Sequence, residues 1–212
     1  MTLTVDQSET APKAATAKAI WNVQPQLAYL QAIREVLPLD GFFVDEISQM
    51  GFASWYGFPV YRPRGFITAG CQGTLGSGFP SALGVKAAFP DRAVVSVTGD
   101  GGFMFAVQEL ATAVQYGLNV ITVVFNNSSF GNVRRDQIQG FGGRVIGADL
   151  VNPDFVALAE AFGVAGFRAN TPEELKRLLD AALTLDAPVL IEVPIERGSE
   201  ASPWEFLTPS FP

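Results

Sequence analysis

The chain alternates short apolar runs with segments of helical periodicity along most of its length, and this alternation limits the folds open to it. The apolar runs are expected to be strands, and they cover residues 42–44, 67–68, 93–97, 120–125, 164–168 and 189–193. Helices are expected between them, at residues 23–37, 82–88, 103–116, 155–162 and 172–183. Strands that alternate with helices in this way predict an α/β fold, with a doubly wound, mostly parallel sheet and helices on both of its faces.

The length and composition of the chain predict a single domain. Of its 212 residues, 48% are hydrophobic and 17% are charged, which is enough apolar surface for a large core. Residues 1–19 are mostly small and polar, so we expect a flexible leader or linker there. Residues 20–198 are predicted to form the domain itself, and residues 199–212 a C-terminal tail.

The composition also argues against several classes of function and partner. The formal net charge of −7 disfavours nucleic-acid binding, which depends on clustered cations. No apolar run approaches the roughly 20 residues that span a membrane. We recognise no signal peptide, and the single cysteine, Cys71, cannot form an intrachain disulfide, so we expect a cytoplasmic protein. Because histidine is absent, a Ser-His-Asp or Cys-His site cannot be built within the chain.

Polar residues directly follow three of the predicted strands. They are Asp45, Asp100 and the pair Asn126-Asn127. In doubly wound folds, ligands bind at the carboxyl ends of the strands, so this edge of the sheet is the expected site. A polar, glycine-containing stretch at 126–152 follows, and long irregular segments of this kind are often functional.

The most specific sequence pattern combines two of these polar positions that follow predicted strands. Residues 99–102 read Gly-Asp-Gly-Gly, and Asn127 lies 27 residues after Asp100. The glycines allow a sharp turn from strand to helix, and free amides at the helix start favour a phosphate. The next helix and strand return the chain to the same edge, so Asp100 and Asn127 are expected to share one ion. Their hard oxygen atoms suit Mg²⁺ or Ca²⁺.

Each half of this pattern is common in ordinary turns, and the combination is what resembles a known family. Gly99-Asp100-Gly101 followed by Asn126-Asn127 resembles the signature of thiamine-diphosphate enzymes. The wider similarity, over roughly residues 24–194, is to the C-terminal pyrophosphate-binding domain of the acetolactate synthase, benzoylformate decarboxylase and pyruvate decarboxylase group.

The resemblance implies specific roles for residues of this chain. It implies that Mg²⁺ is bound by the side chains of Asp100 and Asn127 and by the backbone carbonyl of Ser129. Leu75 would support the bent shape of thiamine diphosphate, although on its own it would be taken for a core residue. The Gly73 carbonyl would accept a hydrogen bond from the 4′-amino group. The full set of implied cofactor-binding residues is Gly73, Thr74, Leu75, Gly99, Gly101, Gly102, Gly131 and Asn132.

The implied activity is that of a 2-oxo-acid decarboxylase or carboligase, with the cofactor acting as its own base. Enzymes of the group also need a pyrimidine-binding domain that supplies a glutamate, and we recognise no such unit here. We therefore expect a partner domain or subunit within a homo- or hetero-oligomer, and we identify no catalytic residue in this chain.

The substrate is not fixed by the sequence. Asn132 and Asp136 stand where acetolactate synthases typically have methionine and tryptophan. Arg134 and Arg135 are either partners of a substrate carboxylate or part of a solvated loop. Two other functions stay open: the β subunit of a 2-oxo-acid oxidoreductase, and a non-catalytic cofactor-binding module. Cys71 alone could not supply the cysteine ligands expected of the oxidoreductase.

Overall fold

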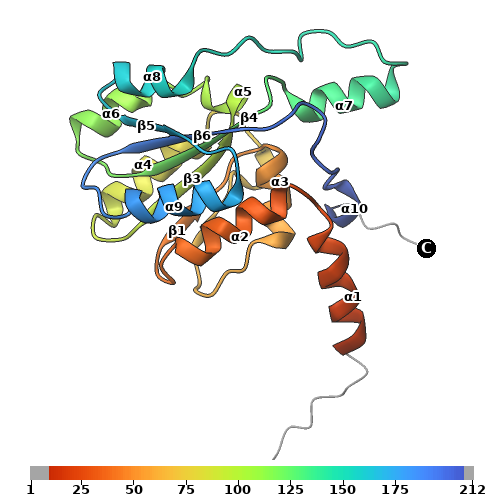
Figure 1. Ribbon diagram of the computed structural model, residues 1–212, viewed down its shortest axis with the longest axis horizontal. Helices are drawn as coiled ribbons and strands as arrows, with labels where there is room; N and C mark the ends of the chain where they lie inside the picture. Colours follow the sequence, from red (N-terminus) through yellow and green to blue (C-terminus); the bar gives the residue numbers. More distant parts are fainter. Residues whose placement is uncertain (1–9, 208–212) are drawn as a thin grey trace, which may run out of the picture.

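The computed structural model describes residues 10–207, and its centre is one six-stranded sheet (Figure 1). All pairs of neighbouring strands are parallel, in the order β2-β1-β3-β4-β6-β5. The strands are β1 (Phe42–Val44), β2 (Phe66–Ile67), β3 (Val94–Gly99), β4 (Ile121–Asn126), β5 (Ala165–Arg168) and β6 (Val189–Pro194). Every strand overlaps an apolar run of the sequence, and the predicted α/β class is confirmed.

Helices cover both faces of the sheet (Figure 1). They are α1 (Thr10–Trp21), α2 (Gln26–Val36), α3 (Gln49–Gly57), the 3-10 turn η2 (Gly70–Gln72), α4 (Gly78–Ala88), α5 (Asp100–Phe103), α6 (Glu109–Gln115), α7 (Gly131–Gly140), α8 (Phe155–Ala161), α9 (Pro172–Ala182) and α10 (Trp204–Leu207). Among the described residues, no helix is both long and apolar enough to cross a membrane.

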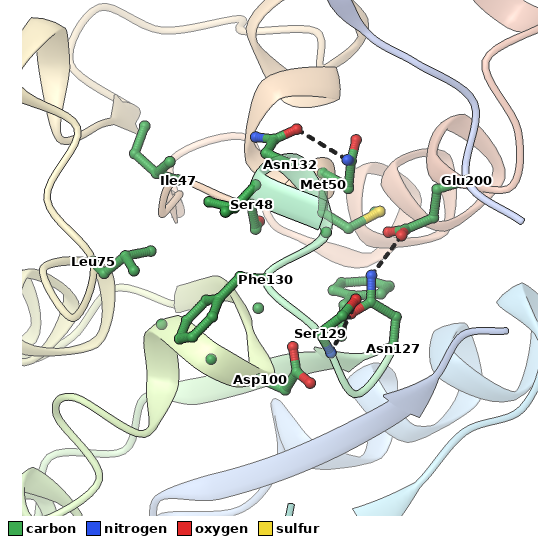
Figure 2. Close-up of a pocket in the computed structure, with 17 residues that line it drawn as sticks. Ile47, Ser48, Met50, Leu75, Asp100, Asn127, Ser129, Phe130, Asn132 and Glu200 are labelled. Carbon is green, nitrogen blue, oxygen red and sulfur yellow. Dashed lines mark hydrogen bonds between the residues drawn. The ribbon is translucent and has the colours of Figure 1, made fainter. Parts of the chain in front are cut away.

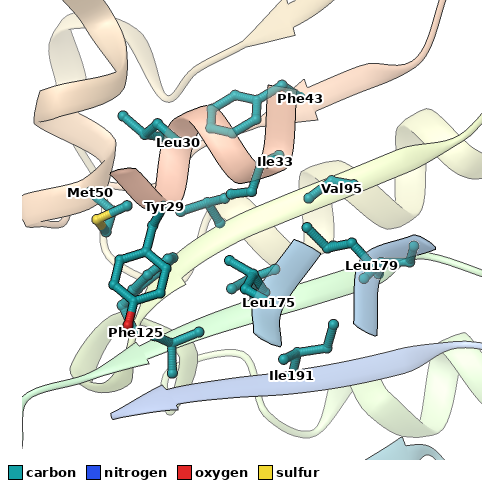
Figure 3. Packing of buried hydrophobic residues seen from close by; sticks show 14 of the residues in the cluster. Tyr29, Leu30, Ile33, Phe43, Met50, Val95, Phe125, Leu175, Leu179 and Ile191 are labelled. Carbon is teal, nitrogen blue, oxygen red and sulfur yellow. The ribbon is translucent and has the colours of Figure 1, made fainter. Parts of the chain in front are cut away.

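One face of the sheet packs against α2, α3 and α9 (Figure 3). Leu30 and Ile33 of α2 are fully buried there, and Phe43 of β1 stacks on Phe58 with ring centroids 4.0 Å apart. Each such side chain contributes roughly 1.5–3 kcal/mol on burial. The opposite face packs against α4, α6 and α8, where Phe103 is also fully buried. Strands buried on both faces explain why the sequence shows continuous apolar runs.

The strand order brings the carboxyl ends of β3 and β4 together. The two strands are paired from Val95 and Ile121 to Gly99 and Phe125. The chain leaves β1 toward β2 at one edge of the sheet, and it leaves β3 in the other direction, toward β4. The topological switch therefore lies between β1 and β3, and ligands are expected at the carboxyl ends of the strands there.

Several local expectations differ from the structure. Helix α1 starts at Thr10, so residues 10–19 of the expected leader are helical, while residues 1–9 lie outside the described part of the chain. The division into leader, domain and tail stays a prediction. The stretch expected to be irregular after Asn126 contains helix α7, which buries none of its residues and so has no apolar periodicity. The single helix predicted at 103–116 is divided into α5 and α6, because residues 105–110 form tighter turns.

Candidate functional site

A cavity of about 190 Å³ lies at the carboxyl ends of β3 and β4 (Figure 2). Its walls contain most of the residues that the sequence singled out. These are Leu75, Gly99, Asp100, Gly101, Gly102, Asn127, Ser129, Gly131 and Asn132. Gly73 and Thr74 do not line the cavity but directly precede Leu75. The sequence thus located the cavity, while the role of each residue stays a prediction.

Asp100 begins helix α5 at the end of β3 and is only 2% exposed. Its Oδ2 accepts a hydrogen bond of 2.6 Å from Asn152 Nδ2. Burial raises the pKa of the Asp100 carboxyl, and hydrogen bonds from Asn152 and from the backbone amides of Gly101 and Ser129 oppose that rise. A buried carboxylate beside a cavity is suited to bind a cation, because a positive charge would offset the loss of hydration.

Asn127 follows β4 and faces the same cavity as Asp100 (Figure 2). Its Oδ1 accepts hydrogen bonds from Ser129 N at 3.1 Å and Ser129 Oγ at 2.9 Å. Its Nδ2 donates to Glu200 Oε2 at 2.7 Å. The turn after β4 therefore folds around the carboxamide oxygen, on the same edge of the sheet as the Asp100 carboxylate.

The donor set fits a hard cation that also has ligands from outside the protein. Among the described residues there is no group of three His, Cys, Asp or Glu side chains that could hold a metal. One carboxylate, one carboxamide oxygen and one backbone carbonyl are too few for the roughly six oxygens that Mg²⁺ prefers. Phosphate oxygens and water commonly complete such a shell.

The glycines of the turn after β3 are required by close packing. A Cβ added to Gly102 would lie 2.0 Å from Glu46 Oε1, and one added to Gly101 would lie 2.4 Å from a ring carbon of Phe130. The backbone at the start of α5 is therefore in close contact with two neighbouring segments, and any side chain here would displace them.

Glu46 supports the site from the core side, although sequence reasoning overlooked it. The residue is fully buried, and its carboxylate accepts hydrogen bonds from Gly76 N at 2.6 Å, Gly78 N at 3.2 Å and Thr98 Oγ1 at 3.0 Å. Burial raises its pKa. Glu46 thus connects the loop that carries Leu75 to strand β3.

Asp45, the residue singled out instead of Glu46, does not line the cavity. It follows β1 as expected, but its carboxylate accepts hydrogen bonds from Trp55 and Ser54 of helix α3. The sequence signal for Glu46 was that two acidic residues, Asp45 and Glu46, directly follow β1. Because successive side chains of an extended chain point in opposite directions, only one of the two can face the site.

The C-terminal segment contributes Glu200, a second wall residue that the sequence did not reveal. Burial, assisted by the negative charge of Asp100, raises the pKa of Glu200 to about 7. Gln49 of α3 also lines the cavity: its Nε2 donates to Asn132 Oδ1 at 3.0 Å, while its Oε1 is buried without a partner.

A second cavity of about 220 Å³ adjoins the first, with Gln49, Asn127 and Glu200 in both walls. Arg134 and Arg135 of α7 line it. Arg134 pairs with Asp149 at 2.8 Å and Arg135 with Asp136 at 2.9 Å, so each cation already has an acidic partner.

Comparison with known proteins identifies the family. The protein-family model described as "Thiamine pyrophosphate enzyme, C-terminal TPP binding domain" matches residues 46–193. The chain belongs to this family. Its cavity lies within the matched region except for Glu200, and the domain is a thiamine-pyrophosphate-binding domain (thiamine diphosphate is the same compound) of the acetolactate-synthase-like type.

Its relatives are much longer proteins. The acetolactate synthase large subunit of Parasynechococcus marenigrum is 42% identical over 85% of this chain and 29% of its own length. Acetolactate synthase isozyme 3 large subunit of Escherichia coli is 40% identical over 76% of this chain and 28% of its own length. The chain therefore spans less than a third of these curated relatives.

A solved structure gives the same assignment of fold and family. The Rhodococcus jostii RHA1 thiamine diphosphate-dependent 4-hydroxybenzoylformate decarboxylase is 32% identical, with a TM-score of 0.75. The similarity covers 81% of this chain and 32% of that protein.

Proposed function

We propose that this domain binds thiamine diphosphate through Mg²⁺ and serves a 2-oxo-acid decarboxylase or carboligase. The observation that carries the proposal is the meeting of Asp100 and Asn127 in one cavity, beside the glycine turn 99–102. The Asp100 carboxylate, the Asn127 Oδ1 and the Ser129 carbonyl would hold the cation. Diphosphate oxygens would complete its coordination.

The rest of the cavity would orient the organic part of the cofactor. Gly101 and Gly102 at the start of α5 would lie against the diphosphate, and Gly131 and Asn132, which also line the cavity, would contact the cofactor. Leu75, on the loop that Glu46 holds, would support the bent conformation, and the Gly73 carbonyl would accept a hydrogen bond from the aminopyrimidine. When bound, thiamine diphosphate supplies a nucleophilic carbon and an electron acceptor for loss of carbon dioxide from a 2-oxo acid.

A pyrimidine-binding domain is the expected partner. The chain spans less than a third of relatives that are named as acetolactate synthases, so a complete active site would need further protein. That domain, in the same or another subunit, would supply the glutamate that contacts the aminopyrimidine ring. Arg134 and Arg135 of the second cavity would face the carboxylate of the 2-oxo acid, which would take the place of their present acidic partners, Asp149 and Asp136.

Isothermal titration with thiamine diphosphate, with and without Mg²⁺, tests the cofactor site. We expect saturable binding that requires the metal and a loss of more than about 100-fold in affinity in Asp100→Ala, because the only charged ligand is removed. Asp91→Ala, an exposed carboxylate before β3, is the matched control and should bind normally. Near-normal affinity in Asp100→Ala would refute the assignment.

A pyruvate turnover assay tests the rest of the proposal. We expect no turnover by the chain alone and recovery when a pyrimidine-binding partner is added. Binding that no partner converts into turnover would instead favour a non-catalytic module.

A further inference from the structure

The C-terminal segment that follows β6 returns to the cavity and is attached there at several points. Ile195 N donates to Asn126 O at 2.8 Å, beside the proposed metal turn. Further along, Ala201 N donates to Gln24 O at 3.1 Å, and Gln26 Nε2 donates to Ala201 O at 2.7 Å. Glu200 is thus held between two anchored positions.

Arg197 of the same segment binds the backbone of the turn after β4. Its guanidinium donates to Asn127 O at 3.3 Å and to Ser128 O at 2.6 Å, and its Nη1 pairs with Asp149 at 3.1 Å. The two carbonyls that precede Ser129 are therefore drawn toward the C-terminal segment.

Glu200 acts on the side chain of the turn. Asn127 Nδ2 donates to Glu200 Oε2 at 2.7 Å, and the backbone amide of Ser129, which can only donate, contacts Asn127 Oδ1 at 3.1 Å. The Asn127 oxygen must then face the opposite way, where it accepts from Ser129 and borders the cavity (Figure 2). Glu200 on one side and Ser129 on the other together decide which end of the carboxamide is available to a cation.

We propose that Glu200 is a positioning residue that orients Asn127 for cation binding. The inference rests on the proposed function, because it takes Asn127 as a ligand. Residues that hold a metal ligand by hydrogen bonds commonly change metal affinity by roughly 10- to 100-fold when they are replaced. Glu200 lies 73 residues from Asn127 and outside the region that the family model matches.

Three variants of the full chain separate orientation from charge. Glu200→Ala removes the acceptor, Glu200→Asp keeps the charge but is one methylene too short, and Glu200→Gln removes the charge but keeps an oxygen at the same reach. Binding of Mn²⁺, a paramagnetic substitute for Mg²⁺, is measured by electron paramagnetic resonance in the presence of thiamine diphosphate. We expect affinity to fall roughly 10- to 100-fold in Glu200→Ala and Glu200→Asp, and to stay within a few-fold of the parent in Glu200→Gln.

Two results would overturn the proposal. If Glu200→Gln is as weak as Glu200→Ala while Glu200→Asp binds normally, the charge of Glu200 matters and its orientation of Asn127 does not. If all three variants bind like the parent, Glu200 has no such role. Glu196→Gln, an exposed carboxylate on the same segment, should change nothing. Should Glu200→Ala not fold, Glu200→Asp and Glu200→Gln still give the comparison.

The parent chain and Asp100→Ala keep this test separate from that of the proposed function. If the parent chain does not bind Mn²⁺ and thiamine diphosphate, or if Asp100→Ala binds them normally, the cofactor site itself is wrongly assigned. If the parent chain binds, Asp100→Ala does not, and the three Glu200 variants bind with the affinity of the parent, only the positioning role of Glu200 is refuted.

Discussion

Two loops border the cavity, and they are held in different ways. The loop at 73–78, which carries Leu75, is fixed from the core by the buried Glu46. The turn at 126–130 is fixed from outside by Arg197 and Glu200 of the C-terminal segment. Glu46 lies 30 residues before Gly76, the first amide that it binds, whereas Glu200 lies 73 residues after Asn127. The loop at 73–78 therefore depends on the stability of the whole domain, whereas the turn at 126–130 can loosen when the C-terminal segment detaches.

The largest effect is expected from removal of the core support. Glu46→Ala would remove the acceptor of the buried Gly78 amide and of the part-buried Gly76 amide, together with one of the two acceptors near the Thr98 hydroxyl. We expect the free energy of unfolding to fall by about 4 kcal/mol, measured by urea denaturation. Glu160→Ala, an exposed carboxylate of α8, is the control and should change it by less than about 0.5 kcal/mol. Equal stability of the two variants would show that Glu46 is not an anchor.

A pH-dependent effect is expected at the outer support. In metal-free protein, the pKa of Glu200 is raised from 4.5 to about 7, so the folded state holds a proton that the unfolded state has lost. The stability linked to this group is complete below pH 4.5 and disappears as the pH rises to about 7. Compared with Glu200→Gln, which does not titrate, the parent chain should lose about 3 kcal/mol over that window. Parallel stability curves for the two proteins would contradict the shift.

A smaller effect on stability is expected at Gly102, where the turn after β3 contacts the Glu46 carboxylate. Gly102→Ala would force a methyl group against the Glu46 carboxylate and should destabilise the fold by about 2 kcal/mol. Gly84→Ala is the matched control: its Cβ meets nothing within 4 Å inside helix α4, and we expect a gain of up to about 1 kcal/mol. Thermal unfolding of both variants measures the difference, and a neutral Gly102→Ala would mean that Glu46 moves aside easily.

The smallest effect on stability is expected at the far end of the C-terminal segment. Trp204 packs on Phe52 with ring centroids 5.0 Å apart, and Arg135 lies over it at 5.4 Å. Trp204→Ala should lower the free energy of unfolding by about 1 kcal/mol, yet speed tryptic cleavage after Arg197, because the segment loses an anchor. Tyr116→Ala, which removes an exposed aromatic ring at the end of helix α6, should leave the cleavage rate unchanged. Unchanged cleavage in Trp204→Ala would show that the segment is held elsewhere.

The central strands β1, β3, β4 and β6 were predictable because they are buried on both faces and are therefore continuously apolar. The turn 99–102 and Asn127 were predictable because both lie where neighbouring parallel strands end. Helix α7 was missed since it buries no residue, and α3 was missed since its aromatic residues show no single apolar face. Glu200 could not be found from sequence, because nothing local shows that residues 73 apart are in contact.

The position of β6 has a consequence for how the molecule is made. This last strand lies between β4 and β5, so β5 has no neighbour in the sheet until Val189–Pro194 has left the ribosome. Glu192 of β6 also accepts a hydrogen bond from Asn126 and pairs with Arg168 of β5. During synthesis, the Asn126 side chain therefore gains its contact with Glu192 only after β6 has been made. The cavity wall is complete later still, once the chain extends as far as Glu200.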